Sequence, residues 1–109
     1  MADDKKWVKV CRTDEIEVDD VYGSEIEGSS YAVYRLKDRY YATEGLCTHE
    51  QAKLCLGYLD GTIIECPKHN ARFDITTGRA LRKPAVKDLK TYAVKEENGL
   101  LYIGLPITG

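Results

Sequence analysis

Hydrophobic and polar residues alternate over short stretches in the first half of the chain. Residues 7–11 (WVKVC) alternate, and residues 30–36 (SYAVYRL) and 40–43 (YYAT) lie on either side of a short turn. Aromatic and β-branched residues with a period of two are typical of half-buried strands. The pattern therefore predicts three short β-strands, with a turn between the second and the third.

The clearest hairpin signal lies towards the other end, in residues 92–105 (YAVKEENGLLYIGL). Asn98 and Gly99 both tolerate the positive φ that the two central residues of a type I′ turn require. Two further strands are expected to pair there. Helix is scarce, because the apolar residues of 13–22 form no convincing helical face and predict one turn at most.

Residues from about 44 to 84 differ from these β segments. They contain four glycines, two prolines and both histidines of the chain, and only 62–65 (TIIE) suggest a strand. Glycine and proline at such density are typical of turns and loops. The sequence therefore predicts an all-β, antiparallel framework into which a small lobe is inserted at about 44–84.

Length and charge narrow the range of functions. A chain of 109 residues, 43% hydrophobic and 31% charged, can bury one modest core, so residues 1–109 are expected to form a single domain. No apolar run approaches a membrane span and the first residues lack the order of a secretory signal, so we expect a cytoplasmic protein without a membrane partner. A net charge of −2, with both signs mixed, predicts no nucleic-acid partner.

The candidate chemistry lies in two Cys/His pairs. Both histidines closely follow a cysteine, as Cys47-x-His49 and Cys66-x-x-His69, with sixteen residues between the pairs. A cytosolic chain keeps its thiols reduced, so these spacings indicate metal ligation rather than disulfides. One tight loop can bring a thiolate and an imidazole to a single centre, and two such loops can hold it from opposite sides.

Two kinds of centre compete for this ligand set. Zinc takes all four side chains in one tetrahedron, whereas a [2Fe–2S] cluster takes two cysteines on one iron and two histidines on the other. Zinc fingers generally group cysteines together and histidines together, but here the two types alternate. Alternation favours the cluster, because each loop then supplies one ligand to each iron. A zinc-stabilised interaction domain without redox activity stays open as an alternative.

The residues around both pairs resemble the Rieske [2Fe–2S] pattern. The match comprises Cys47-Thr48-His49, 57–61 (GYLDG), Cys66-Pro67-Lys68-His69, 73–78 (FDITTG) and 90–99 (KTYAVKEENG). The chain is most similar to the small Rieske ferredoxins of bacterial aromatic-ring-hydroxylating dioxygenase systems of the naphthalene and biphenyl kind. The resemblance implies a Rieske-type antiparallel β-sandwich or barrel with an inserted cluster-binding lobe. It also implies one [2Fe–2S] cluster per chain, held by Cys47, His49, Cys66 and His69.

The same resemblance implies an electron carrier rather than an enzyme. Its donor would be an NAD(P)H-dependent flavoprotein reductase, and its acceptor a terminal Rieske oxygenase. The residues agree, because an oxygenase needs two further histidines and a carboxylate for mononuclear iron, and the chain has only two histidines. No Gly-x-Gly-x-x-Gly follows a strand to bind a dinucleotide. The small subunit of a nitrite-reductase-type complex, whose fold is similar, is the second alternative.

Within this family, the high-potential respiratory type carries a disulfide between its ligand loops and hydroxyl groups near the cluster. Here Ala52 and Lys68 replace the two cysteines, Ala71 replaces a serine and Phe73 replaces a tyrosine. Hydroxyl donors stabilise the electron that the cluster gains, so their loss predicts a reduction potential near the low end of the Rieske range, roughly −150 mV. Lys83-Pro84-Ala85 resembles the proline-containing loop that shields the cluster.

A carrier must bind its partners weakly through a small patch, so that each complex dissociates quickly. Lys53, Leu54, Leu56 and Lys68 lie near enough to the ligand pairs in the sequence to contribute to such a patch. Packing within the loop is the alternative role of the two leucines.

Cys11 and Cys55 fall outside both Cys/His pairs. Cys55 lies six residues beyond His49, too far along the loop to occupy the disulfide position of the respiratory type. Both are expected to be ordinary free thiols.

Overall fold

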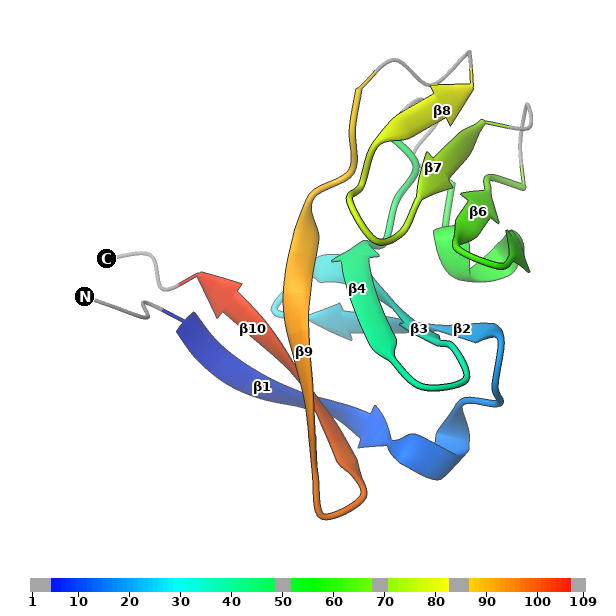
Figure 1. Ribbon diagram of the computed structural model, residues 1–109. Coiled ribbons are helices and arrows are strands. Elements are labelled where there is room, and N and C mark those ends of the chain that lie inside the picture. The colour runs from blue at the N-terminus through cyan, green and yellow to red at the C-terminus, as the bar shows by residue number, and fades with distance from the viewer. Residues whose placement is uncertain (1–4, 49–51, 68–70, 83–86, 107–109) are drawn as a thin grey trace.

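The computed structural model describes residues 5–48, 52–67, 71–82 and 87–106 (Figure 1). Regular structure in these ranges consists of β-strands and two short 3-10 helices, η1 (Thr13–Glu15) and η2 (Leu54–Leu56). The predicted all-β class is therefore confirmed. Neither of these helices has the length or the apolar character needed to cross a membrane, and the described ranges contain no other helix.

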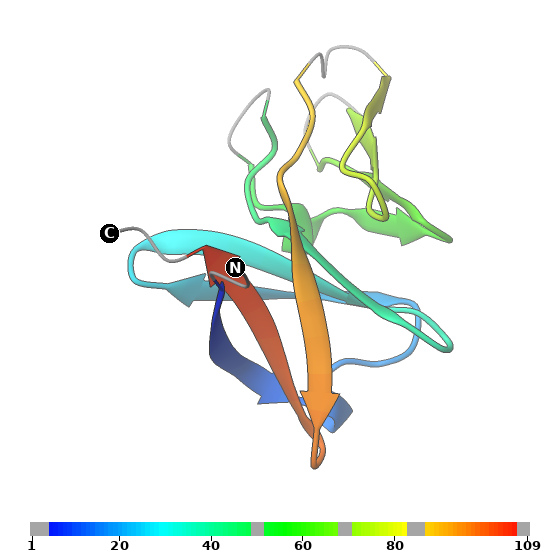
Figure 2. The same ribbon diagram turned by 60° about the vertical axis from the view of Figure 1, so that its left-hand side comes forward.

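Six strands form one antiparallel sheet, here called the framework, in the order β1-β10-β9-β4-β3-β2. Figures 1 and 2 show this sheet strongly curled. Because of the curl, side chains of β1 and β10 share one hydrophobic core with side chains of β3 and β4. The six strands are β1 (Lys5–Arg12), β2 (Asp20–Ile26), β3 (Ser29–Arg35), β4 (Tyr40–Glu44), β9 (Thr91–Glu97) and β10 (Leu100–Pro106).

Four short strands form a second antiparallel sheet, in the order β5-β6-β7-β8. In the chain they fall between β4 and β9, and in Figures 1 and 2 they stand beyond one end of the framework. The described residues between 45 and 90 are called the lobe below. Its strands are β5 (Tyr58–Asp60), β6 (Ile63–Glu65), β7 (Arg72–Asp74) and β8 (Ala80–Arg82).

The predicted strands 7–11, 30–36, 40–43 and 62–65 correspond to β1, β3, β4 and β6. The predicted C-terminal hairpin is also confirmed. Asn98 and Gly99 have φ angles of 54° and 78°, and the strands that they join pair from Glu97 and Leu100 onward.

Strand β2 was not predicted. It lies at the edge of the framework sheet, and its segment DVYGSEI combines two acidic residues with Gly23, so alternation is weak. The scarcity of helix in 13–22 is borne out, because the single turn η1 is its whole helical content.

Strand β3 is buried on both faces and connects the two parts of the molecule. Val33 packs in the framework core, whereas Ala32 and Tyr34 pack in a second core beneath the lobe. That second core, here called the lobe core, consists of Ala32, Tyr34, Cys47, Leu54, Ile64, Cys66, Ala71, Phe73, Ile75 and Leu89. Full burial of an aliphatic or aromatic side chain contributes about 1.5–3 kcal/mol, so this shared wall fixes the lobe on the framework.

Candidate metal centre

The first Cys/His pair begins at the tip of a hairpin that continues from β4. Leu46 and Lys53 form an isolated antiparallel bridge, and the Leu54 N–H donates to the Gly45 carbonyl at 2.9 Å. At the tip, the Cys47 N–H donates to the Ala52 carbonyl at 2.8 Å. This hydrogen bond closes a six-residue loop, of which Cys47 is the first residue and Ala52 the last.

The second pair begins in the same way, between β6 and β7. Glu65 pairs with Arg72, and the Cys66 N–H donates to the Ala71 carbonyl at 2.7 Å. The Arg72 side chain also contacts the Glu65 carboxylate at 3.0 Å across the base of this hairpin. Both loops thus have a cysteine at the first position, an alanine at the sixth, and the same closing hydrogen bond.

Both cysteines are 1% exposed and both belong to the lobe core, so the two predicted thiolate ligands are buried in the same core. His49 and His69 lie outside the described residues. Among the described residues, no three Cys, His, Asp or Glu side chains group as metal ligands do, although only two of the four predicted ligands fall within that part of the chain. Two buried sulfurs at matched hairpin tips fit a cluster that takes one thiolate and one imidazole from each loop.

Three hydroxyl groups on or next to β3, β4 and the first hairpin donate to protein oxygens. Thr48 Oγ1, next to Cys47, donates to the Lys87 carbonyl at 2.7 Å. Thr43 Oγ1 donates to the Glu44 carbonyl at 2.8 Å, so the buried Tyr34 hydroxyl must be the donor in its 2.9 Å contact with Thr43. Burial, opposed by this hydrogen bond, raises the pKa of Tyr34, and the phenol stays neutral.

Ala71 and Phe73 stand at the two positions where, by the sequence resemblance, the high-potential respiratory type of the Rieske pattern has hydroxyl groups. Both are fully buried in the lobe core beside Cys66. Ala71 closes the second loop with its carbonyl, and Phe73 pairs with Ile64 across β6 and β7. Their apolar side chains add packing at these positions and no hydrogen-bond donor.

The other two cysteines are free thiols, as predicted. Cys11 is buried in the framework core, where burial first and the nearby Glu15 carboxylate second raise its pKa to about 11. Cys55 is half-buried on η2, and Gly23 of β2 has no room for a Cβ because the Cys55 sulfur occupies that space. Neither cysteine belongs to the lobe core.

The proposed docking residues divide into two groups. Leu54 is fully buried in the lobe core, so its assignment to a surface patch was wrong, and the packing alternative holds for it. Leu56, two residues on, is 72% exposed. Tyr58, which sequence reasoning missed, is 67% exposed and pairs with Glu65, the residue before Cys66. The signal was present as alternation, since Leu59 faces inwards between exposed Tyr58 and Asp60.

Lys53 is exposed, and Lys68 lies outside the described residues, as do Lys83-Pro84-Ala85. Leu56 and Tyr58 are the two most exposed large apolar side chains among the described residues, at 72% and 67%. We call them the apolar pair.

A curled β framework that carries a lobe with two matched cysteine hairpins defines a small cluster-binding β protein. Comparison with known proteins specifies the class, because residues 6–93 match the family model of the Rieske [2Fe-2S] domain. The chain belongs to the Rieske family.

Individual relatives agree with this assignment. The chain is 44% identical over 100 residues to the ferredoxin component of the naphthalene 1,2-dioxygenase system of Pseudomonas putida, covering 92% of this chain and 96% of that protein. The Sphingomonas yanoikuyae B1 ferredoxin has a similar structure, with a TM-score of 0.86 and 37% identity over 93% of this chain and all of that one. A chain in the complex of reduced oxygenase and oxidised ferredoxin of carbazole 1,9a-dioxygenase gives a TM-score of 0.83 at 36% identity, covering 89% and 91%.

Proposed function

We propose that Cys47, His49, Cys66 and His69 hold one Rieske-type [2Fe–2S] cluster. The observation that carries the proposal is the pair of matched hairpin tips, which bury one cysteine each in the same core. When bound, the cluster supplies one-electron redox chemistry. With two thiolates and two neutral imidazoles as ligands, its oxidised form is uncharged, so the protein needs no fixed counter-charge in that state.

The chain then serves as the ferredoxin of an aromatic-ring-hydroxylating dioxygenase system. It carries single electrons from an NAD(P)H-dependent flavoprotein reductase to a terminal Rieske oxygenase. The relatives named as ferredoxin components support this role, and so does the histidine count, which leaves none for a mononuclear iron site. We place it in the cytoplasm, with residues 1–109 acting as one unit, and the free thiols Cys11 and Cys55 fit a reducing compartment.

A low reduction potential follows from the surroundings of the cysteines. The hydroxyl protons of Tyr34, Thr43 and Thr48 go to protein oxygens, and Ala71 and Phe73 supply none. Hydroxyl donors would stabilise the reduced, negatively charged state, so the apolar side chains of Ala71 and Phe73 lower the potential relative to Ser and Tyr at these positions. A redox titration should give roughly −150 mV, and a midpoint well above zero would contradict this assignment.

We further propose that the apolar pair, Leu56 and Tyr58, contacts the redox partners. Both side chains stand on short elements of the lobe, and the strand partner of Tyr58 directly precedes Cys66. Exposed aromatic and leucine side chains beside a redox centre suit a small interface of fast exchange. Steady-state electron transfer through a Leu56→Ser variant should show a raised apparent KM for the ferredoxin, with the visible spectrum unchanged.

One set of measurements on freshly purified protein tests the cluster itself. Iron and acid-labile sulfide should each be present at about two per chain, with a Rieske-type EPR signal after reduction. A colourless protein with one zinc per chain would establish the zinc-stabilised domain instead. Persistent co-purification with a large reductase would favour the nitrite-reductase-type alternative.

A further inference from the structure

Residues 87–90, here called the strap, are the last residues of the lobe and lead into β9. They form hydrogen bonds with the first cysteine hairpin. The Glu44 N–H donates to the Lys90 carbonyl at 2.9 Å, and the Lys90 N–H donates to the Glu44 carboxylate at 2.8 Å. Further along the same hairpin, the Thr48 hydroxyl donates to the Lys87 carbonyl at 2.7 Å. One end of the strap is therefore held at the base of the hairpin and the other end beside Cys47.

The same four residues are fastened to the sheet that carries the second hairpin. The Ala80 N–H donates to the Asp88 carboxylate at 2.8 Å, and the Leu89 N–H donates to the Gly78 carbonyl at 2.7 Å. Gly78 has a φ of +82°, and a Cβ there would collide with the Leu89 carbonyl. The Leu89 side chain is buried in the lobe core with Cys47 and Cys66.

Glu44 is the residue at which these contacts meet. Its N–H and carboxylate hold Lys90, and its carbonyl accepts the hydrogen bond from Thr43, which in turn accepts one from the buried Tyr34. Asp88 provides the corresponding side-chain contact towards the β7–β8 side. Two carboxylates that accept hydrogen bonds from backbone N–H groups thus connect the strap to the first cysteine hairpin and to the sheet that carries the second.

We infer that Glu44 and Asp88 are positioning residues for the cluster, acting through the strap. Two thiolates from different hairpins can share one iron only if the hairpins keep a fixed separation, and residues that support the ligands set that geometry. The inference rests on the proposed ligand set. It adds that the separation is maintained by side-chain contacts to the backbone of residues 87–90, in addition to the packing of the lobe core.

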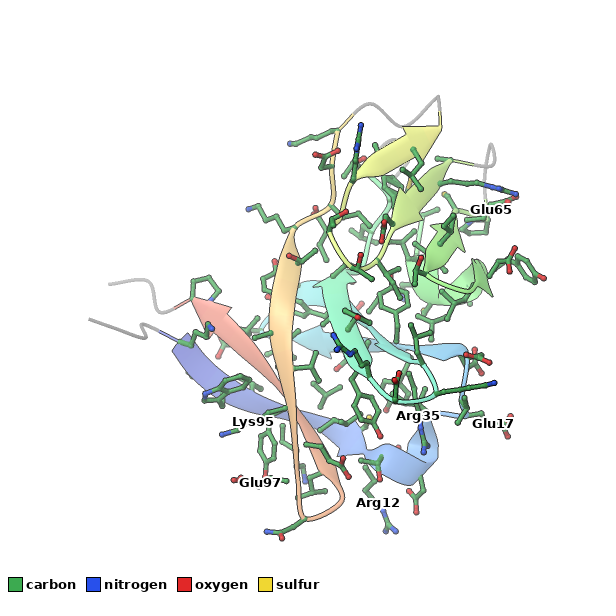
Figure 3. All side chains as sticks on the ribbon, viewed as in Figure 1. Arg12, Glu17, Arg35, Glu65, Lys95 and Glu97 are labelled. Carbon is green, nitrogen blue, oxygen red and sulfur yellow. The ribbon has the colours of Figure 1, made fainter. Side chains whose placement is uncertain are left out.

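The test compares variants that lose the hydrogen bond with variants that lose only the charge. Glu44→Ala and Asp88→Ala remove the acceptor, whereas Glu44→Gln and Asp88→Asn keep an oxygen that can accept the same bond. Glu15→Ala is the matched control, because the Glu15 carboxylate accepts the Arg12 N–H at 2.9 Å at the end of the framework far from the lobe (Figure 3, where Arg12 is labelled).

The readouts are iron release to a chelator and the EPR spectrum of the reduced cluster. The alanine variants should release iron about five- to tenfold faster than wild type, as expected for the loss of one half-exposed hydrogen bond, and should show shifted g-values. The Gln and Asn variants should stay within about twofold of wild type with unshifted g-values, although their potentials should rise with the lost charge.

Two outcomes would overturn the inference. Equal acceleration in Glu15→Ala would show a general loss of stability, and an unchanged EPR spectrum in both alanine variants would show that the strap does not set the cluster geometry. Wild-type protein that contains no iron would refute the proposed function itself, which is a separate result obtained before any variant is made.

Discussion

Both hydrophobic cores of this protein bury cysteine, but the cysteines lie in different local structures. In the framework core, Cys11 sits within β1, next to a bulge and paired with Leu101 of β10. In the lobe core, Cys47 and Cys66 each stand at a hairpin tip and use their own N–H groups to close a loop. The loop residues of each tip include a histidine, whereas no histidine neighbours Cys11.

The difference shows that burial alone does not mark a ligand. The thiol of Cys11 is stabilised in its neutral form, since its pKa is raised to about 11. A cysteine ligand must instead be presented as a thiolate with a second donor close by, and a short closed loop that carries both residues provides this. Replacing the cysteines of each core by alanine therefore distinguishes a buried free thiol from a cluster ligand.

The largest effect is expected from the lobe cysteines. Cys47→Ala or Cys66→Ala should abolish the visible absorption of the cluster, because an iron loses one of its two thiolates. His49→Ala and His69→Ala should likewise abolish the Rieske EPR signal. Absorption spectra and iron content of the purified variants measure the loss.

Cys11→Ala and Cys55→Ala provide the controls, since neither thiol belongs to the lobe core. Each should keep the full iron content and a spectrum nearly identical to wild type. Loss of the cluster in Cys55→Ala together with its retention in Cys66→Ala would mean that the ligands are assigned wrongly.

Much of the fold and of the candidate site could be predicted from the sequence. Period-two alternation predicted β1, β3 and β4, and Asn98-Gly99 predicted the last turn, because both signals are local. The Cys/His spacing predicted two loops in the same way. Local signals did not suffice everywhere, because β2, β5, β7 and β8 also pair with strands next to them in the chain and were not predicted.

The remaining features depend on contacts between distant segments. The sequence left Leu54 open between a surface patch and loop packing, and the structure buries it in one core with Tyr34, which is twenty positions earlier in the chain. The contacts of Glu44 with Lys90 span 46 positions, and no pattern of residue types marks them. Strand β2 was missed because Gly23, Ser24 and Glu25 interrupt its apolar residues, so its sequence has no period of two.

The next effect in size concerns the packing of the two cores. Phe73→Ala in the lobe core should destabilise the protein by about 3–5 kcal/mol, and Leu101→Ala in the framework core by about 2–5 kcal/mol. Denaturant titration followed by circular dichroism measures both. At denaturant concentrations where each variant is still folded, only Phe73→Ala should also release iron faster, because Phe73 packs in the same core as both cysteines. Equal iron release from the two variants would contradict a separate role for the lobe core.

The free thiol of the framework core predicts a smaller, pH-dependent effect. Its pKa is about 11 when folded and 9.0 ordinarily, so the folded state favours the protonated thiol. The stabilisation is complete below pH 9.0 and is lost as the pH rises towards about 11, by roughly 2 kcal/mol in all. In Cys11→Ala, the free energy of unfolding should fall less steeply across this window than in wild type. Identical slopes would show that Cys11 does not titrate on unfolding.

The smallest effect distinguishes the two cysteine hairpins from each other. The second hairpin is built on β6 and β7, which pair over three residues, whereas beyond β4 the first has the single bridge Leu46–Lys53, and its tip contacts the strap through Thr48. Thr48→Val should therefore cost about 1 kcal/mol and speed iron release several-fold, whereas Thr48→Ser, which keeps the hydroxyl, should not. Arg72→Ala removes the half-exposed ion pair at the base of the second hairpin and should change iron release less than Thr48→Val does. If Arg72→Ala accelerated iron release more than Thr48→Val does, the second hairpin would depend more on its side-chain contact than the first. That result would contradict the distinction drawn here between the two hairpins.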